Sequence, residues 1–321
     1  MTPPVAFYCI SSDLYFPGAV ALVNSLRLVG HSEPIFLLDC GLSDAHRKLI
    51  ATEVTIVETS AESAPHLLKT VAPTSHPAQT MVLIDVDMIA TRPLTQLIEA
   101  AASGRVVAVK DNLDRFVAEW GELLDLGAIR PHPYVSSGLV ALGGAVGSEV
   151  LRLWDRSRHR VDYEQSWFER DVAGYPFRFI DQDVLNAVLG TVAEDELVVE
   201  SARAAPHQPY RGLRIVDQAT LECAYEDGSQ PFVLHQYLGK PWVSPMYHGI
   251  YSQLMRRLWL GDDVAIAFPA DEVPSRMRKG RLASIERKLI DVGDLARWYV
   301  RDVIPEWARA RFEGSRAGGS T

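Results

Sequence analysis

The stretch MVLIDVDMIATRPL, residues 81–94, joins four uncharged apolar residues directly to the acids Asp85 and Asp87. An apolar run of this kind is typical of a strand that is buried on both faces. Because side chains alternate along a strand, both carboxylates are predicted to point to the same side. Adjacent carboxylates at a buried strand end repel each other, and a divalent cation is the usual compensation. The stretch predicts either a metal site that can hold a substrate diphosphate or, with equal weight, a strand that ends in two solvated acids.

Strand and helix patterns alternate through the first half of the chain. Strand patterns lie at residues 5–10, 35–38, 55–57, 81–84 and 106–109, and helical patterns lie at about 17–28, 43–50 and 94–102. This alternation predicts an α/β fold with a mostly parallel central sheet covered by helices. Ligands of such sheets bind beyond the carboxyl ends of the strands, which is where residues 11–13 and the two acids fall.

The second half of the chain is less regular and shows no internal repeat. Its patterns are strands at 134–142 and 232–234, helices at 150–156, 184–189 and 246–260, and a strongly amphipathic helix at 283–304. Asp181, Gln182 and Asp183 open the helix at 184–189, where acids complement the positive end of the helix dipole. His235 directly follows the strand at 232–234, where a capping or core histidine is the simplest interpretation.

The composition is that of a globular protein, with 47% hydrophobic and 23% charged residues in 321 positions. The net charge of −9 argues against a general nucleic-acid-binding protein. Three scattered cysteines without a CxxC motif indicate reduced thiols. The start of the chain shows no signal-peptide pattern, and its apolar runs are strand-length, so we expect a cytoplasmic protein.

The charge is unevenly distributed, because residues 276–321 carry a net charge of +5 and the preceding residues carry −14. Basic and aromatic side chains are mixed on the helical pattern near 283–304. Such a helix can lie on an anionic membrane surface, here the inner face of the membrane. A helix packed on the rest of the protein, or a dimer contact, explains the pattern slightly better. The oligomeric state does not follow from the sequence.

Several segments between residues 5 and 242 resemble a known family when they are taken together, in order and spacing. They are FYCISSDLYFPGAVALVNSLR, LLDCGLSDAHRK, VLIDVDMIATRPL, YVSSGLVALGG, IDQDVLNAVL and LHQYLGKPW. The family is the GT-A-fold glycosyltransferases of family 8, the glycogenin and lipopolysaccharide galactosyltransferase group. The resemblance implies a Rossmann-like GT-A catalytic domain over residues 1–260, with a nucleotide-sugar half at about 1–110 and an acceptor half at about 111–260. Residues 261–321 would form a helical C-terminal extension with a disordered tail.

The resemblance also implies a metal site. Asp85, Asp87 and His235 would hold Mn²⁺ or Mg²⁺ against the diphosphate of the donor. As a Lewis acid, the metal would offset the charge that develops on the leaving nucleoside diphosphate. His235 must present a neutral ring nitrogen to act as a ligand.

The donor-binding residues follow from the same resemblance, and they are Ser11, Ser12, Asp13, Tyr15, Val86, Ser136, Ser137, Gly138, Gly239 and Lys240. Tyr15 would pack on the nucleobase, Gly239 would allow close approach of the backbone, and Lys240 would reach the phosphates. Each has an ordinary structural explanation as well, in loop caps, turns or a solvated lysine. The sequence reads HxxxGKPW where the family has HxxGxxKPW, so Gly239 and Lys240 are each displaced by one position.

For catalysis, the resemblance places Asp181, Gln182 and Asp183 at the sugar and the acceptor. Gln182 matches the position that faces the anomeric carbon from the side opposite the leaving group. Because an amide is a poor nucleophile, covalent double displacement is disfavoured. We expect retention by same-face attack, in which the leaving phosphate accepts the proton of the acceptor.

The predicted function is therefore a metal-dependent transfer of a hexose from a nucleotide sugar, predicted to be UDP-linked, to a sugar or glycolipid acceptor. A haloacid-dehalogenase-like phosphohydrolase also carries DxD after a strand and is a competing interpretation. Its nucleophilic Asp normally lies near the start of the chain, whereas here a strand-helix unit precedes the acids. A non-catalytic sugar-nucleotide- or glycan-binding protein would keep the same fold. A nucleotidyltransferase would carry a glycine-rich basic loop after the first strand, and residues 11–13 do not provide one.

Overall fold

The computed structural model describes residues 2–60, 64–243 and 249–281. Its centre is a seven-stranded sheet of order β3-β2-β1-β4-β7-β6-β8. The strands of this sheet are β1 Val5–Ser11, β2 Ile35–Asp39, β3 Thr55–Glu58, β4 Thr80–Ile84, β6 Val106–Lys110, β7 Val135–Gly143 and β8 Leu197–Glu200. Only β7 is reversed, because it pairs antiparallel with both β4 and β6 whereas the other pairs are parallel. The predicted mostly parallel α/β sheet is confirmed.

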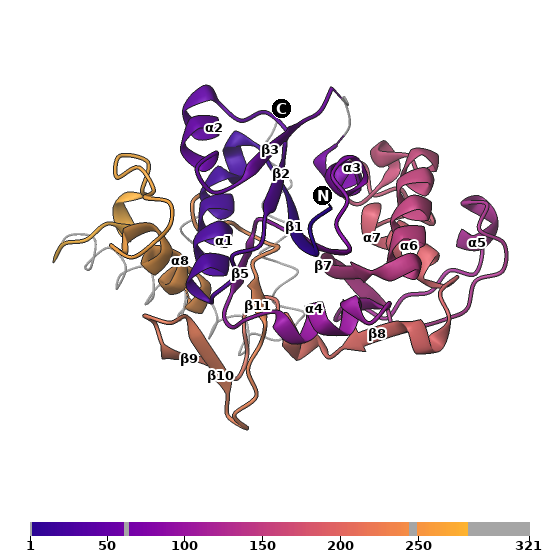
Figure 1. The fold of residues 1–321 in the computed structure, drawn as a ribbon. Coiled ribbons are helices and arrows are strands. Elements are labelled where there is room, and N and C mark those ends of the chain that lie inside the picture. Colours follow the sequence, from indigo (N-terminus) through magenta and orange to yellow (C-terminus); the bar gives the residue numbers. More distant parts are fainter. Residues whose placement is uncertain (1, 61–63, 244–248, 282–321) are drawn as a thin grey trace, which may run out of the picture.

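Helices cover both faces of the sheet (Figure 1). They are α1 Phe16–Leu28, α2 Asp44–Ile50, α3 Val71–Ser75, α4 Thr95–Ala102, α5 Trp120–Leu123, α6 Gly144–Ser157, α7 Asp181–Leu189 and α8 Ile250–Leu260. Side chains of α1, α4 and α8 belong to one buried cluster, and those of α5, α6 and α7 belong to a second cluster. The sheet therefore lies between two hydrophobic cores.

Strand β4 explains why the run before the acids is apolar throughout. Val82 and Ile84 pack in the core that includes α1, whereas Met81 and Leu83 pack in the core that includes α6. All four side chains are buried. A central strand covered on both faces needs apolar residues at every position, as predicted from the sequence.

Two small sheets complete the fold. Strand β5 Met88–Ala90 pairs antiparallel with β11 Val233–His235, and β9 Leu213–Asp217 pairs antiparallel with β10 Glu222–Tyr225. Strands β5, β8, β9 and β10 were not predicted from the sequence. These strands have three to five residues, and an isolated short run has too little periodicity to distinguish it from a loop.

Helix boundaries differ from the predicted ones at two places. The helix predicted at 150–156 is longer, because α6 begins at Gly144, directly after β7. The helix predicted from residue 246 is described only from Ile250 onward. After α8 the chain continues along the same core, where Ile266 and Phe268 are buried. The predicted amphipathic helix at 283–304, its membrane contact and the disordered tail lie outside the described residues.

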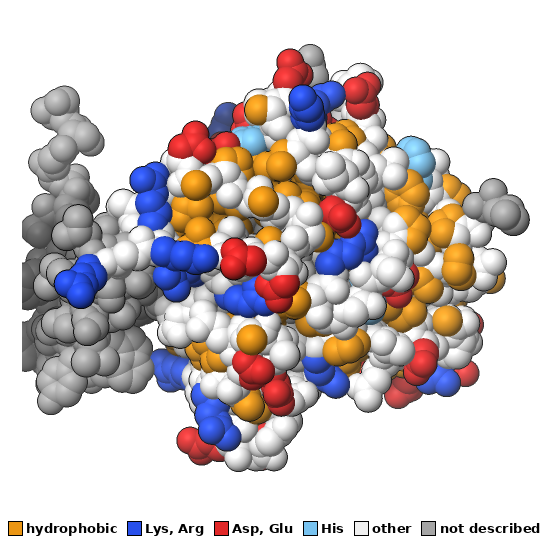
Figure 2. Space-filling view, turned by 60° about the vertical axis from the view of Figure 1, so that its left-hand side comes forward, with side chains coloured by type: hydrophobic (Ala, Val, Ile, Leu, Met, Phe, Trp, Pro, Cys, Tyr) orange, Lys and Arg blue, Asp and Glu red, His pale blue; other side chains and the backbone are white. Residues whose placement is uncertain are grey.

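The surface mixes apolar and charged side chains. Figure 2 shows a face on which hydrophobic side chains are interrupted by charged side chains of both signs. Within the described residues, every helix is too short or too polar to cross a bilayer.

Candidate metal and donor site

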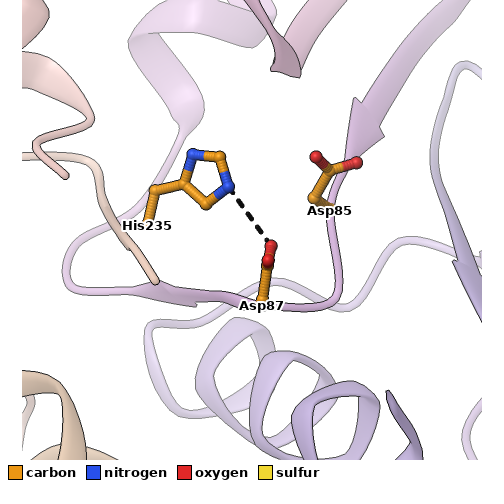
Figure 3. A group of neighbouring side chains, drawn as sticks. All are labelled: Asp85, Asp87 and His235. Carbon is orange, nitrogen blue, oxygen red and sulfur yellow. Dashed lines mark ion pairs between the residues drawn. The ribbon is translucent and has the colours of Figure 1, made fainter. Parts of the chain in front are cut away.

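The two acids lie in the turn that joins β4 to β5. The Asp85 N–H donates to Gly138 O of β7 (2.9 Å), and the Met88 N–H donates back to Asp85 O (3.1 Å). The carboxylates are therefore brought together by a turn, rather than by the strand alternation predicted from the sequence. Figure 3 shows the side chains of Asp85, Asp87 and His235 pointing toward one another from separate positions on the backbone.

His235 reaches the acids through the small sheet. It pairs with Met88 in the antiparallel register of β11 and β5, and Met88 directly follows Asp87. The His235 Nε2 atom lies 3.3 Å from Asp87 Oδ1. Asp85, Asp87 and His235 offer ligand atoms that all lie within 4.8 Å of one another. The predicted association of a distant imidazole with the acid pair is therefore present in the fold.

This donor set suits a hard or borderline divalent cation. Two carboxylates and one imidazole are the ligand types that Mn²⁺ accepts and that Mg²⁺ accepts in part. Asp87 Oδ1 and His235 Nδ1 are both buried; His235 Nδ1 has no hydrogen-bond partner among the described residues, and Asp87 Oδ1 faces the His235 Nε2 atom without forming a well-aligned hydrogen bond. Gly138 leaves room beside them, because a Cβ there would lie 3.1 Å from both Asp85 Oδ2 and His235 Cε1. The residues present thus fit a cation in ligand type and space.

Two lysines that are far apart in the sequence, Lys69 and Lys240, each form an ion pair with one of the two acids. Lys69 Nζ lies 2.8 Å from Asp85 Oδ1 and 3.1 Å from Asp181 Oδ2. Burial acts to lower the pKa of Lys69, but the carboxylates of Asp181 and Asp85 outweigh burial and hold that pKa above its usual range. Lys69 was not predicted from the sequence, where its only signal is a single lysine in the stretch HLLKTVAP.

Lys240 contacts the second acid. Its Nζ donates to Asp87 and to Tyr237 O, the latter over 3.0 Å. Burial raises the pKa of Asp87, but Lys240 and His235 outweigh burial and hold that pKa well below its usual range. Asp87 is therefore a carboxylate at neutral pH. The displaced spacing of HxxxGKPW thus still delivers Lys240 to the acid site.

The loop that carries Lys240 is held by a buried amide. The Gln236 Nε2 donates to Leu238 O and to Gly239 O, both over 3.0 Å. Tyr210 in turn donates its hydroxyl proton to Gln236 Oε1 or to His235 O, at 2.9 and 3.0 Å. Gly239 has φ 34°, in the region that favours glycine. Gln236 and Tyr210 were not predicted, because buried hydrogen bonds over this separation leave no local pattern.

The predicted donor loop after β1 lies against the same segment. The Tyr15 ring centroid is 5.6 Å from Lys240 Nζ and 6.2 Å from the Trp242 ring. The Trp242 indole N–H donates to Leu14 O over 2.7 Å. Gly18 allows the start of α1 to lie close to the backbone of Val86 and the ring of Trp242, because a Cβ there would lie 2.5 Å from Val86 O and 2.9 Å from the Trp242 ring. Tyr15, Val86, Gly239 and Lys240 are thus brought close to the acids.

Ser11 and Asp13, the other residues of that loop with side-chain hydrogen bonds, use them within the protein. Ser11 is buried, and its hydroxyl donates to Ser12 O (3.1 Å). The Asp13 carboxylate accepts from the Ser43 N–H (2.7 Å) and faces His46 Nδ1 (2.7 Å). Asp13 therefore ties the loop to the start of α2, which is the capping explanation offered by the sequence.

Strand β7 and helix α7 lie on the side of the acids where the resemblance places the sugar, and hydrogen bonds join them. The Ser137 hydroxyl donates to Asp181 Oδ2 (2.7 Å), and the Ser137 N–H donates to Gln182 Oε1 (3.3 Å). The Gln182 amide donates to Asp111 Oδ2 (3.3 Å), a residue that was not predicted from the sequence. Ile180, just before α7, has φ 40°, which is strained for a β-branched residue. Ser136, Ser137 and Gly138 lie on β7, and the two serines are buried; their place at the sugar remains a prediction of the resemblance.

Asp183 differs from its neighbours in α7. Its side chain is fully buried and accepts from the Tyr134 hydroxyl (2.6 Å), the Arg115 Nε (2.9 Å) and the Phe179 N–H (2.8 Å). Burial raises its pKa above the usual value even though these donors act to lower it. With three donors around one enclosed carboxylate, Asp183 fits a supporting role better than a contact with substrate.

Comparison with known proteins finds structures of similar fold but no matching sequence family. No protein-family model matches the chain, and no curated protein matches it. The bifunctional glycosyltransferase WbbM, in its apo structure, superposes with a TM-score of 0.51 at 14% identity over 82% of this chain and 50% of that chain. This likeness shows a shared fold. The chain spans about half of WbbM.

Two structures of LgtC are also similar at low identity. An active-site mutant superposes with a TM-score of 0.49 at 13% identity, over 78% of this chain and 94% of LgtC. The galactosyltransferase LgtC in complex with donor and acceptor sugar analogs superposes with a TM-score of 0.48 at 12% identity, over 78% and 95%.

Proposed function

We propose that the protein is a metal-dependent glycosyltransferase that transfers a hexose from a UDP-linked sugar to a saccharide or glycolipid acceptor. The observation that carries the proposal is the convergence of Asp85, Asp87 and His235 within 4.8 Å at the end of a central strand. The fold shared with WbbM is consistent with it. Family 8 remains our inference from the sequence segments quoted above.

Asp85, Asp87 and His235 would hold Mn²⁺ or Mg²⁺, which when bound supplies Lewis-acid stabilisation of a departing diphosphate. Lys240 lies beside Asp87 and can direct its ammonium group to a phosphate as a point charge. Tyr15 lies next to Lys240, so a nucleobase stacked on Tyr15 would place its diphosphate toward the acids. These contacts order the donor from base to phosphates across the end of the sheet.

The sugar would lie between β7 and α7. Lys69, Ser137 and Asp181 already form a hydrogen-bonded group there, and such a group can exchange partners with sugar hydroxyls. Gln182 uses its oxygen toward Ser137 and its nitrogen toward Asp111. An amide fixed in this way orients groups but does not form a covalent bond to the anomeric carbon. Retention by same-face attack, with the leaving phosphate as the proton acceptor, is the mechanism that we propose.

A thermal-shift screen of UDP-sugars with and without Mn²⁺ tests this function. At a ligand concentration of about 100 Kd, binding stabilises the folded protein by about 2.7 kcal/mol. We expect stabilisation that requires the metal and disappears in Asp87→Ala, with Asp227→Ala as a control because Asp227 is an exposed acid paired with Arg203. Stabilisation that persists in EDTA contradicts the metal assignment.

Activity assays on the same protein distinguish the competing functions. A phosphohydrolase would hydrolyse p-nitrophenyl phosphate and leave UDP-sugars intact. A non-catalytic binding protein would show metal-dependent binding of the nucleotide without turnover in the presence of saccharides. Membrane contact and a cytoplasmic location remain predictions from the sequence.

A further inference from the structure

Four aromatic rings form a shelf at the edge of the proposed site. His66 comes from the 3₁₀ turn η2 Pro65–Leu68, and Tyr163, Trp167 and Phe168 come from the segment that begins with η4 Tyr163–Gln165. We call these four residues the aromatic shelf.

The rings of the shelf are ordered with respect to one another. His66 and Phe168 are stacked with centroids 4.3 Å apart and planes 24° apart. Tyr163 is nearly parallel to Phe168, at 6.2 Å and 9°, and Trp167 meets Phe168 edge-on at 5.4 Å and 72°. Despite these contacts, Trp167 is 43% exposed and Phe168 is 37% exposed. Large exposed aromatic side chains gathered in one place usually mark a binding surface.

Hydrogen bonds hold the shelf in place. Ser166 is fully buried between the two aromatic positions, and its hydroxyl donates to Tyr163 O (2.7 Å). The Trp167 N–H donates to Arg178 O (2.9 Å), and the Asp171 N–H donates to Ser166 O (2.8 Å). The shelf is therefore formed before any ligand arrives, which lowers the entropy cost of binding.

The shelf adjoins the sugar wall of the site. His66 lies three residues before Lys69, which contacts both Asp85 and Asp181. Tyr163 stacks against His66, with ring centroids 6.3 Å apart, so the segment that carries the exposed rings packs on the turn that precedes Lys69. The exposed rings are thus joined through η2 to Lys69, beside the place where the transferred sugar would lie.

The charges around the shelf limit what can bind there. The segment 162–169 contains Asp162, Glu164 and Glu169 and no lysine or arginine. The neighbouring arginines are paired, Arg170 with Glu164 and Arg178 with Asp171 (2.7 Å each), so the segment keeps an acidic balance. An anionic ligand would be repelled, whereas carboxylates accept hydrogen bonds from hydroxyls. The apolar C–H face of a pyranose ring fits an aromatic surface, whose π face carries negative potential.

We propose that the aromatic shelf binds a neutral pyranose ring of the acceptor saccharide, with Trp167 and Phe168 as the stacking residues. This proposal rests on the proposed glycosyltransferase function. The shelf selects acceptors by ring stacking, and the neighbouring carboxylates select for uncharged sugars. It lies outside the set of residues that would hold the metal and the diphosphate.

The test measures saccharide binding and nucleotide binding separately. Saturation-transfer NMR is recorded with methyl β-lactoside, methyl β-maltoside and methyl β-cellobioside in the presence of UDP and Mn²⁺, and the hyaluronan disaccharide serves as the anionic probe. We expect a neutral disaccharide to bind and the anionic one not to bind. In Trp167→Ala/Phe168→Ala, we expect its affinity to fall about tenfold or more, which corresponds to about 1.4 kcal/mol or more.

Matched variants keep the test decisive. Phe116→Ala removes an aromatic ring of similar exposure, 39%, that packs on Trp120 instead, and we expect it to bind saccharide within twofold of the wild type. Trp167→Phe keeps a stacking ring, so we expect it to retain most of the affinity. Calorimetry of UDP with Mn²⁺ should give the same affinity in every variant.

Several results would overturn the proposal: no neutral disaccharide binds the wild type, binding is unchanged in the double variant, or UDP affinity falls together with saccharide affinity. The last result would assign the rings to the donor. If instead UDP and Mn²⁺ fail to bind the wild type, the proposed function fails while saccharide binding to the shelf is still measured without nucleotide.

Discussion

Gly138→Ala offers a close test of the candidate metal site, because the structure specifies what the added methyl group would meet. The new Cβ would lie 2.6 Å from Met88 Cε and 3.1 Å from both Asp85 Oδ2 and His235 Cε1. The flexible end of Met88 can move away, but Asp85 and His235 can move away only by leaving the positions in which they would hold the metal. Gly138 has no positive φ, so backbone strain does not contribute.

The magnitude follows from these contacts. Displacing ligands through a neighbouring side chain typically costs 10- to 100-fold in metal affinity, which is about 1.4–2.7 kcal/mol. Inserting one methyl into a packed interior costs about 1–3 kcal/mol of unfolding free energy. We therefore expect weaker Mn²⁺ binding, measured by calorimetry in the presence of UDP, together with a lower midpoint in urea.

Gly147→Ala is the matched control. Its Cβ would lie 2.6 Å from the Leu142 backbone carbon, away from the acids, so it should destabilise the protein and leave Mn²⁺ affinity unchanged. If Gly138→Ala binds Mn²⁺ as tightly as the wild type while its stability falls, Gly138 does not border the metal, and the reasoning from its contacts is refuted.

Three further predictions concern charge and support. Lys69→Met leaves Asp85 and Asp181 without their shared cation, so we expect the free energy of unfolding, measured in urea, to fall by about 3–5 kcal/mol. An unchanged free energy of unfolding would contradict a buried ion pair between Lys69 and these acids. The folded pKa of Asp87 lies below its unfolded value of about 3.9, so its contribution is complete above about pH 5 and is lost as the pH falls. Urea midpoints between pH 7 and pH 3 should therefore fall less steeply for Asp87→Asn than for the wild type, and parallel curves would argue against the shift. Tyr210→Phe leaves the His235 carbonyl and Gln236 without their shared donor; we expect about 1–3 kcal/mol lower stability and weaker Mn²⁺ binding, whereas weaker binding without lower stability would point to a different role.

The central part of the fold was predictable because burial on two faces leaves a strong pattern. The apolar run of β4 and the alternation of strands with α1, α2 and α4 give periodic signals that survive in a single sequence. The short strands β5, β9 and β10 give none, since three to five residues are stabilised mainly by their partners. One of them, β5, matters to the site, because its pairing with β11 brings His235 to the acids.

The site was predictable only where its residues belong to a motif. Asp85 and Asp87 were predicted from the DxD stretch itself, His235 and Lys240 through the resemblance of the quoted segments, and the structure brings all four together. The residues that were missed are Lys69, Asp111, Tyr210 and Gln236. Lys69 is 16 positions from Asp85, and Asp111 is 71 positions from Gln182. Single polar residues that meet across such separations carry no periodicity, so only the folded chain reveals them.

The most direct test of the metal site is anomalous X-ray diffraction from crystals grown with Mn²⁺ and UDP. We predict one strong manganese peak in contact with Asp85, Asp87 and His235, at ligand distances of about 2.0–2.4 Å, with the UDP diphosphate beside it. A UDP molecule bound at Tyr15 without manganese between these three side chains, or manganese bound elsewhere on the chain, would contradict the metal assignment.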